Sequence, residues 1–257
     1  MIPYFQFTQI HLGPLTIQVW GLLVALGFLA GTQAAAWMAR KRGLDSAVLW
    51  DLLGWIAVAA LVCARLFHVF VYEPQYYLAH PFEIPAIWQG GLSSIGGFIG
   101  GSVAGLLLLR RRKLDVWTYA DAALFGLPLG YAVGRIGCFL IHDHPGTATD
   151  FFLGVRFPDG IVRHDLGLYL SLDAWVLFAL FLVLAKRKAA PGTYVTVFLV
   201  WYGVSRFFLD FLRASGGAIV DTRYFSLTPA QYASLLMVAG GIWSAHCMHR
   251  QNRKTDG

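Results

Sequence analysis

Long apolar stretches, repeated along the whole chain, are the feature that most restricts the fold. Each covers about 20 residues, the length that an α-helix needs to cross the hydrocarbon core of a bilayer. Because unpaired backbone groups are costly in lipid, such stretches predict helices that span a membrane and pack together. We expect an all-α bundle of seven transmembrane helices, at Leu15–Ala39, Leu52–Tyr72, Leu92–Leu109, Trp117–Ile141, Leu166–Ala185, Tyr194–Leu212 and Thr228–Cys247.

The composition supports a membrane protein and argues against a nucleic-acid-binding one. Charged residue types make up 13% of the chain, whereas a soluble domain carries about a quarter. The net charge is +6, but the basic residues form short clusters between apolar stretches, and no basic groove interleaved with aromatic residues is evident. The clustered charges therefore predict no nucleic acid partner, and the even spread of the apolar stretches predicts one transmembrane domain over residues 1–257.

The basic clusters lie in alternate connections, which predicts the orientation of the bundle. They occupy residues 40–42, 110–113, 186–188 and 250–254. Lys and Arg are enriched on the cytoplasmic side of membrane proteins. We therefore expect the N-terminus outside, the C-terminus in the cytoplasm, and the connections rich in His and Asp on the outer face.

Three arginines lie inside apolar stretches: Arg65, Arg135 and Arg206. An arginine in the middle of a membrane helix costs a few kcal/mol, and a lone one often extends to the headgroups or forms a structural ion pair. These three lie seven or eight residues before the outer ends of their spans, a rise of roughly 10–12 Å. Their shared depth favours a common anionic ligand, and guanidinium groups bind phosphate well. We expect them to hold a phospholipid phosphate.

The sixth span carries a polar stripe. Tyr202, Arg206, Asp210 and Arg213 are spaced at i, i+4, i+8 and i+11, which places them on one face of a helix. Arg206 and Asp210 are spaced for an ion pair. A single carboxylate does not neutralise three arginines, so we expect a net positive site.

Histidines in the outer connection suggest two further roles. His142 and His144, with Asp143, His164 and Asp165, have the ligand types that Zn²⁺ accepts. Because His-x-His pairs on loops are common by chance, we expect hydrogen-bonding or solvated roles and no bound metal.

Glycines surround the start of the third span. Gly96 and Gly97 lie in a segment, residues 90–97, that contains two glycine pairs. Glycines in membrane helices usually permit close helix packing, whereas those just before the span could let backbone N–H groups approach a ligand. Both interpretations stay open.

The chain resembles the prolipoprotein diacylglyceryl transferases. The signature G-R-x-G-N-F-x-N-x-E-x-x-G of that family aligns with residues 134–146, which read GRIGCFLIHDHPG. Further matches follow in the same order over nearly the whole chain: Gly13-Pro14, Trp20-Gly21, Ala64-Arg65, the segment 90–97, Arg163-His164, Leu168-Tyr169, Tyr202, Arg206, Arg213 and Gln231.

The resemblance implies a bacterial inner-membrane enzyme that needs no cofactor. Its reaction moves a diacylglyceryl group from phosphatidylglycerol to the thiol of the lipobox cysteine in a prolipoprotein signal peptide, and glycerol phosphate leaves. The resemblance assigns Arg135 to the headgroup and Arg206 to the phosphate. We expect the catalytic residues to be Arg135, Arg206, His142 and Asp143. The expected lipid-binding residues are Arg65, Arg135, Tyr202, Arg206, Asp210, Arg213, Gly96, Gly97 and Trp20.

Several signature positions differ from the family. The family has His at Ile95, Asn at Cys138 and Ile141, Glu at Asp143, Gln at Gly167 and Glu at Leu170. The family histidine is a candidate base for the thiol, so here His142, Asp143, His144 or His164 could take its proton. The alternatives are a paralogue that uses the same phospholipid with another acceptor, and a non-catalytic phospholipid-binding protein.

Overall fold

The structure is a computed structural model that describes residues 1–13, 15–214 and 225–255. It divides into two compact units. Unit 1 comprises Met1–Met38 and Ala120–Gly257, and unit 2 comprises Ala39–Tyr119. The single domain expected over residues 1–257 stays a prediction.

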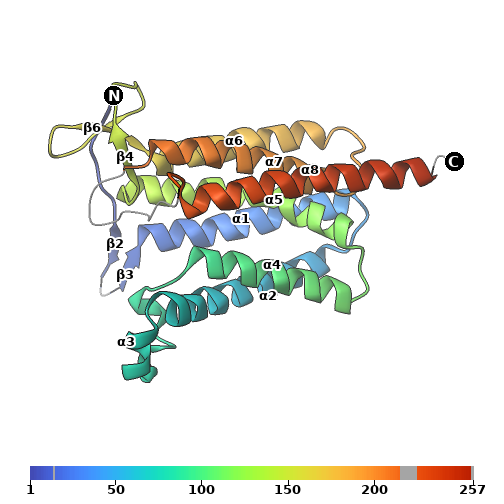
Figure 1. Cartoon of the computed structure of the whole chain (residues 1–257), viewed down its shortest axis with the longest axis horizontal. Coiled ribbons are helices and arrows are strands. Elements are labelled where there is room, and N and C mark those ends of the chain that lie inside the picture. The colour runs from blue at the N-terminus through green and yellow to red at the C-terminus, as the bar shows by residue number, and fades with distance from the viewer. Residues whose placement is uncertain (14, 215–224, 256–257) are drawn as a thin grey trace. The chain divides into compact units, whose positions relative to one another are not determined.

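Unit 1 contains most of the length of five helices that run side by side (Figure 1). They are α1 (Val19–Lys41), α5 (Val116–Ile141), α6 (Leu166–Leu184), α7 (Thr193–Leu209) and α8 (Pro229–Thr255). Both α6 and α8 pack on α7. A short 3₁₀ turn, η4 (Asp210–Leu212), extends the end of α7.

Glycines set the distance between α1 and α5. A Cβ atom at Gly31 would lie 2.9 Å from the carbonyl oxygen of Gly126, and one at Gly130 would lie 2.8 Å from that of Gly27. A Cβ at Gly126 would overlap the carbonyl oxygen of Gly31. Small residues thus let the two backbones touch, which strengthens packing between membrane helices. This contact supports the part of α5 that leads to Arg135.

Two small sheets lie at the ends of these helices. A four-stranded sheet of order β1-β5-β6-β4 joins the N-terminus to the connection between α5 and α6, and a hairpin of β2 and β3 precedes α1. The strands are β1 (Ile2–Pro3), β2 (Gln9–Leu12), β3 (Leu15–Gln18), β4 (Pro145–Ala148), β5 (Val155–Arg156) and β6 (Val162–Asp165).

The hairpin corrects the start of the first expected span. Residues 15–18 pair with residues 9–12 in antiparallel register, so α1 begins at Val19 and not at Leu15. The sequence Leu-Thr-Ile-Gln alternates apolar and polar side chains, and this period of two suits a strand. Apolar content alone placed the helix start too early.

Unit 2 is a pair of long helices with a set of short ones between them. The long helices α2 (Ser46–Phe67) and α4 (Ser94–Arg111) pack on each other. A π-helical turn extends α2, and three short helices lead to α4. These are η1 (His68–Tyr72), α3 (Pro74–Ala79), η2 (Pro81–Glu83) and η3 (Ile87–Gln89).

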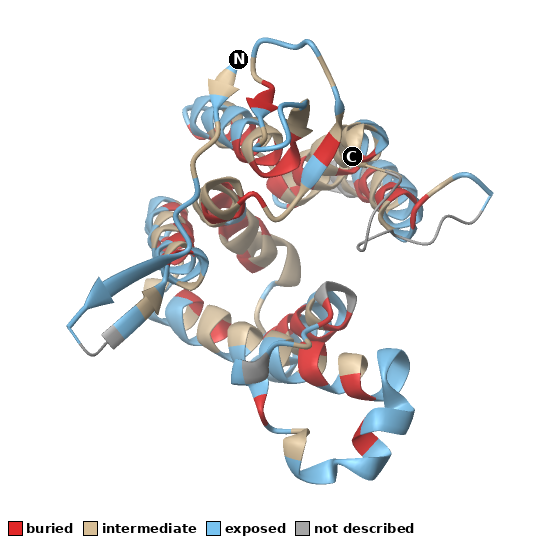
Figure 2. Cartoon of the chain, turned by 90° about the vertical axis from the view of Figure 1, so that its left-hand side faces the viewer, coloured by how far each residue is buried: buried red, intermediate tan, exposed pale blue. Residues whose placement is uncertain are grey.

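The lengths and apolar composition of the helices support a polytopic membrane protein. Within the described residues, five are long and apolar enough to cross a bilayer: Val19–Lys41, Ser46–Tyr72, Val116–Ile141, Leu166–Leu184 and Thr193–Leu212. Exposed positions cover the outer faces of the helices (Figure 2), and they include large apolar side chains such as Trp55, Phe98 and Trp243. Helices α4 and α8 occupy the places of the third and seventh expected spans. The count of seven spans and their orientation stay predictions.

Candidate active site

Arg135 lies near the C-terminal end of α5 and has an aromatic partner. Its guanidinium carbon sits 4.9 Å from the ring centroid of Tyr131, one turn earlier. Its Nη1 atom lies 3.8 Å from the Sγ atom of Cys138. Among the described residues, no carboxylate forms an ion pair with Arg135. A half-buried cation without a carboxylate partner is suited to an anionic ligand.

Helix α7 brings a second arginine toward the same tyrosine. The hydroxyl groups of Tyr131 and Tyr202 lie 3.3 Å apart, and their rings meet edge to face. Arg206 follows Tyr202 by one helical turn, and both Arg135 and Arg206 interact electrostatically with Tyr131. Two of the three expected arginines therefore lie near the same pair of tyrosines.

The ion pair expected between Arg206 and Asp210 is present. Nη2 of Arg206 lies 3.0 Å from Oδ1 of Asp210. The Asp210 side chain is fully buried and also accepts a hydrogen bond from the hydroxyl of Thr228, at the start of α8. This carboxylate fixes the position of Arg206 and offsets its charge, so the uncompensated cation of the pair is Arg135.

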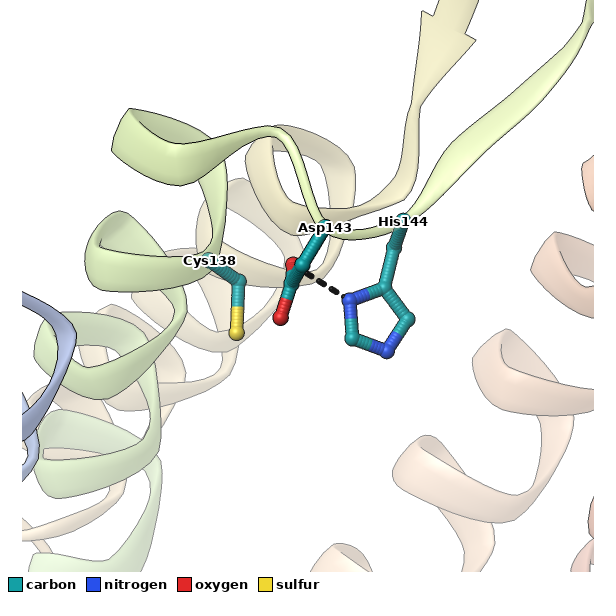
Figure 3. Close-up of side chains that lie close together, drawn as sticks. All are labelled: Cys138, Asp143 and His144. Carbon is teal, nitrogen blue, oxygen red and sulfur yellow. Dashed lines mark hydrogen bonds and ion pairs between the residues drawn. The ribbon is translucent and has the colours of Figure 1, made fainter. Parts of the chain in front are cut away.

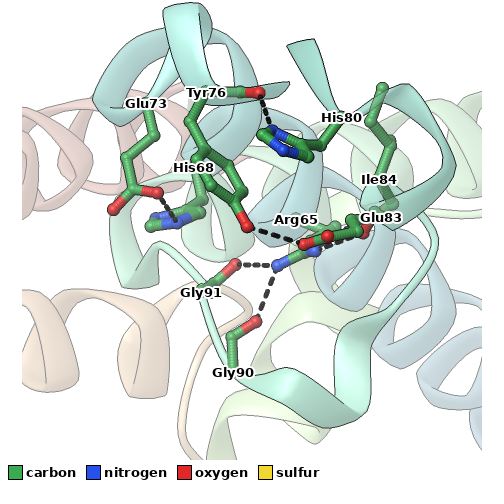
Figure 4. A network of polar contacts seen from close by, with 9 residues as sticks. All are labelled: Arg65, His68, Glu73, Tyr76, His80, Glu83, Ile84, Gly90 and Gly91. Atoms are coloured by element: carbon green, nitrogen blue, oxygen red, sulfur yellow. Dashed lines mark hydrogen bonds and ion pairs between the residues drawn. The ribbon is translucent and has the colours of Figure 1, made fainter. Parts of the chain in front are cut away.

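Arg65 lies in unit 2, and its donors are engaged by backbone carbonyl groups (Figure 4). The side chain is 4% exposed and lies 5.0 Å from the ring of Tyr77. Nε donates to Ile84 at 2.7 Å, Nη2 to Glu83 at 2.6 Å, and Nη1 to Gly90 and Gly91 at 2.7 and 3.2 Å. These bonds tie the segment 83–91 to α2. Because the donors of Arg65 are used in these bonds, Arg65 is left out of the proposed ligand-binding set, and its expected contact with a phosphate stays an untested prediction.

Arg65→Ala should loosen the segment 83–91. The change leaves four carbonyl groups without their donor, and a hydrogen bond to a charged group contributes about 1.5–3 kcal/mol. Hydrogen–deuterium exchange should show faster exchange in residues 83–91. Arg112→Ala is the control, because Arg112 forms an exposed ion pair with Asp51 and such pairs contribute at most about 1 kcal/mol. Equal exchange in the two variants would contradict the structural role of Arg65.

His142 is enclosed and not available to a substrate. Its Nδ1 atom lies 2.6 Å from Oδ2 of Asp165, and both side chains are 1% exposed. Four aromatic rings surround the imidazole: Tyr4, Phe5, Phe139 and Phe157. These contacts give His142 a structural role, since they join the N-terminal segment to the start of α6, and its expected catalytic role stays a prediction.

Asp143 and His144 point the other way, toward the last turn of α5 (Figure 3). His144 Nδ1 lies 2.5 Å from Oδ1 of Asp143, and both side chains are about one-third exposed. The hydrogen bond with Asp143, followed by the contact with Cys138, raises the pKa of His144 to about 9. The pair thus lies beside Cys138, which in turn contacts Arg135.

The remaining expected residues have less direct roles. Trp20 lies in the first turn of α1, where a Cβ at Gly137 would come within 3.2 Å of its Cα. The backbone of Arg213 forms an isolated bridge with Gly146. A Cβ at Gly96 would lie 2.6 Å from the carbonyl oxygen of Cys63, and one at Gly97 would lie 3.3 Å from that of Ala60. Both glycines therefore permit the close packing of α4 on α2, which is the helix-packing interpretation of this segment.

Sequence reasoning missed Tyr131. The available signal was its spacing, since Tyr131 and Arg135 are four residues apart and share a helix face. Tyrosine is common in membrane helices, so this spacing did not stand out until α7 supplied Tyr202.

Together, the apolar helices and the arginines near the ends of α5 and α7 define a polytopic membrane protein with a cationic site. A comparison with family models then identifies its group. The model described as "Prolipoprotein diacylglyceryl transferase" matches residues 8–247, and the chain belongs to this family of transferases in lipoprotein biogenesis.

Named relatives support the same assignment over nearly full length. The chain is 34% identical to a protein of Nitrosomonas europaea over 99% of this chain and 94% of that protein. It is 35% identical to one of Geobacillus kaustophilus, over 91% and 88% of the two chains. A third, from Synechococcus elongatus, is 33% identical over 91% and 84%. All three are named phosphatidylglycerol–prolipoprotein diacylglyceryl transferase, which confirms the resemblance seen in the sequence.

Proposed function

We propose that this protein transfers a diacylglyceryl group from phosphatidylglycerol to the lipobox cysteine of prolipoproteins. The observation that most supports this proposal is the pair of arginines on α5 and α7, which the contact between Tyr131 and Tyr202 links. Arg135 has no carboxylate partner among the described residues, so this pair has a net positive charge toward a ligand. Family membership supports the same class of reaction.

The proposed reaction is a displacement at the glycerol carbon that bears the phosphate ester. The sulfur of the lipobox cysteine attacks this carbon, the carbon–oxygen bond breaks, and glycerol phosphate leaves with the electron pair. A thioether forms, and the thiol proton passes to a base. Arg135 and Arg206 bind the phosphate oxygens and stabilise the charge that develops on the leaving group, a large effect at a preorganised site.

We place this reaction at the outer face of the bacterial inner membrane. The basic connections predict that α5 and α7 end on the outside. Asp143, His144 and the strands β4, β5 and β6 follow the end of α5, so they would lie at that face. There the phospholipid donor and a membrane-anchored signal peptide can meet in the outer leaflet.

The proposed acceptor of the thiol proton is the carboxylate of Asp143, which His144 positions through the contact between the two side chains. Asp143→Asn combined with His144→Ala should lower the transfer rate by about 100-fold at neutral pH, since general base catalysis contributes about 10²–10⁴-fold. The control is His11→Ala, because His11 is exposed on the β2–β3 hairpin. An unchanged rate in the double variant would exclude the pair and leave His164 as the next group to test.

The function is tested with purified protein, phosphatidylglycerol vesicles and a lipobox peptide. Release of glycerol phosphate, with a mass increase of the peptide by one diacylglyceryl group, is the expected result. Complementation of a strain depleted of its own transferase extends the test to cells. Binding of phosphatidylglycerol without release, with any thiol acceptor, would instead favour a non-catalytic phospholipid-binding protein. We keep this alternative because Cys138 and Asp143 stand where the family signature has other residues.

A further inference from the structure

Cys138, Asp143 and His144 form a compact cluster at the end of α5. Their potential ligand atoms all lie within 4.8 Å of one another. The chain leaves the helix at Ile141, and His142 adopts a left-handed backbone conformation with φ of 51°. After this turn His142 contacts Asp165, and the side chains of Asp143 and His144 lie beside that of Cys138 (Figure 3).

We propose that Cys138, Asp143 and His144 bind a Zn²⁺ ion. Thiolate, carboxylate and imidazole are all ligands that Zn²⁺ takes in proteins, and three protein ligands leave a fourth position for water or an anion. The site differs from the set considered in the sequence. His142 and Asp165 bond to each other on the far side of the turn, and Cys138 joins from the helix.

The geometry requires small movements. Tetrahedral Zn²⁺ with bonds of about 2.0–2.3 Å holds its ligand atoms roughly 3.3–3.7 Å apart. The sulfur would therefore approach the other two by up to about 1 Å, and the hydrogen bond between Asp143 and His144 would be replaced by a shared metal. The side chains of Asp143 and His144 are about one-third exposed, so an ion can reach them from solvent.

The charges of the ligands offset the charge of a bound Zn²⁺ ion, whereas one neighbouring residue repels it. Binding breaks the S–H bond of Cys138, forms an S–Zn bond and releases the protons of the thiol and the imidazolium to solvent. A thiolate and a carboxylate then offset the two positive charges of the metal. Arg135 Nη1, 3.8 Å from the sulfur, repels a cation. Metal and Arg135 therefore compete for Cys138, which links this site to the proposed phosphate-binding site.

The test is a titration of purified full-length protein in detergent with Co²⁺ alone, after removal of metals by a chelator. A thiolate-to-cobalt charge-transfer band that saturates at one equivalent, and that Zn²⁺ abolishes, is the expected result. Cys138→Asn carries the family residue at this position and should lose the band. His144→Ala should weaken Co²⁺ binding by about 10-fold or more. Cys63→Ser and Cys247→Ser are the matched cysteine controls and should keep the band.

Two results would overturn the metal site. One is wild-type protein without a charge-transfer band, and the other is a band of equal size in folded Cys138→Asn. The readout does not need the transfer reaction, so the two proposals can fail separately. Co²⁺ binding by a protein that releases no glycerol phosphate would support the metal site and reject the proposed function. Release of glycerol phosphate without Co²⁺ binding would support the proposed function and reject the metal site. If both proposals hold, Zn²⁺ should inhibit the wild-type transfer and leave Cys138→Asn unaffected.

Discussion

Arg135→Ala should abolish the release of glycerol phosphate from phosphatidylglycerol. Arg135 is the cation of the site without a carboxylate partner among the described residues, and it would carry the charge that develops on the leaving phosphate. Removing one donor that stabilises such charge costs about 10²–10³-fold in rate. We expect a loss of at least about 100-fold in the assay with phosphatidylglycerol vesicles and a lipobox peptide.

Two variants sharpen this prediction. Arg135→Lys retains the charge but loses the forked geometry that matches phosphate, so it should keep partial activity. Arg156→Ala removes an exposed arginine from β5, in the same unit, and should keep wild-type activity. Binding of phosphatidylglycerol should fall together with the rate in Arg135→Ala. Full release without Arg135 would reject the proposed site.

Gly126→Ala should destabilise the protein more than any surface change. The added methyl group would overlap the carbonyl oxygen of Gly31, a backbone atom of α1 that cannot rotate away. Overpacking of this kind costs about 1–3 kcal/mol. Thermal unfolding in detergent should show a lower midpoint than that of the wild type.

Gly54→Ala is the matched control. It is also a glycine in a long helix, but a Cβ there meets no atom within 4 Å. Because alanine favours helix over glycine, this variant should be as stable as the wild type or slightly more stable. If both variants unfold at the wild-type temperature, the glycine contact between α1 and α5 does not hold the helices together.

The helices could be predicted because their cause is local. Hydrogen bonds within a helix join residues four apart, so an apolar stretch of sufficient length predicts a membrane helix without reference to the rest of the chain. The same reasoning predicted the Arg206–Asp210 pair, since both residues lie on one helix face. It failed at Leu15, where pairing with Leu12 in a hairpin decided the structure.

The candidate site was predicted less completely, since similar residues have different partners. Arg65 and Arg135 both lie inside apolar stretches, at similar distances along the sequence from the ends of those stretches. Carbonyl groups of the segment 83–91 accept hydrogen bonds from Arg65, whereas the guanidinium group of Arg135 lies over the ring of Tyr131. Nothing local in the sequence distinguishes these outcomes, because the partners come from different folded segments.

The sequence by itself determined that this chain forms membrane helices, which of its cations lie within them, and which family it resembles. The tertiary structure decided which of those groups remain available to a ligand. His142 and His144 are two residues apart, yet the left-handed turn at His142 buries one against Asp165 and leaves the other beside Cys138. The physical reason is that helix formation depends on neighbours along the chain, whereas the satisfaction of a polar group depends on atoms that only folding brings near.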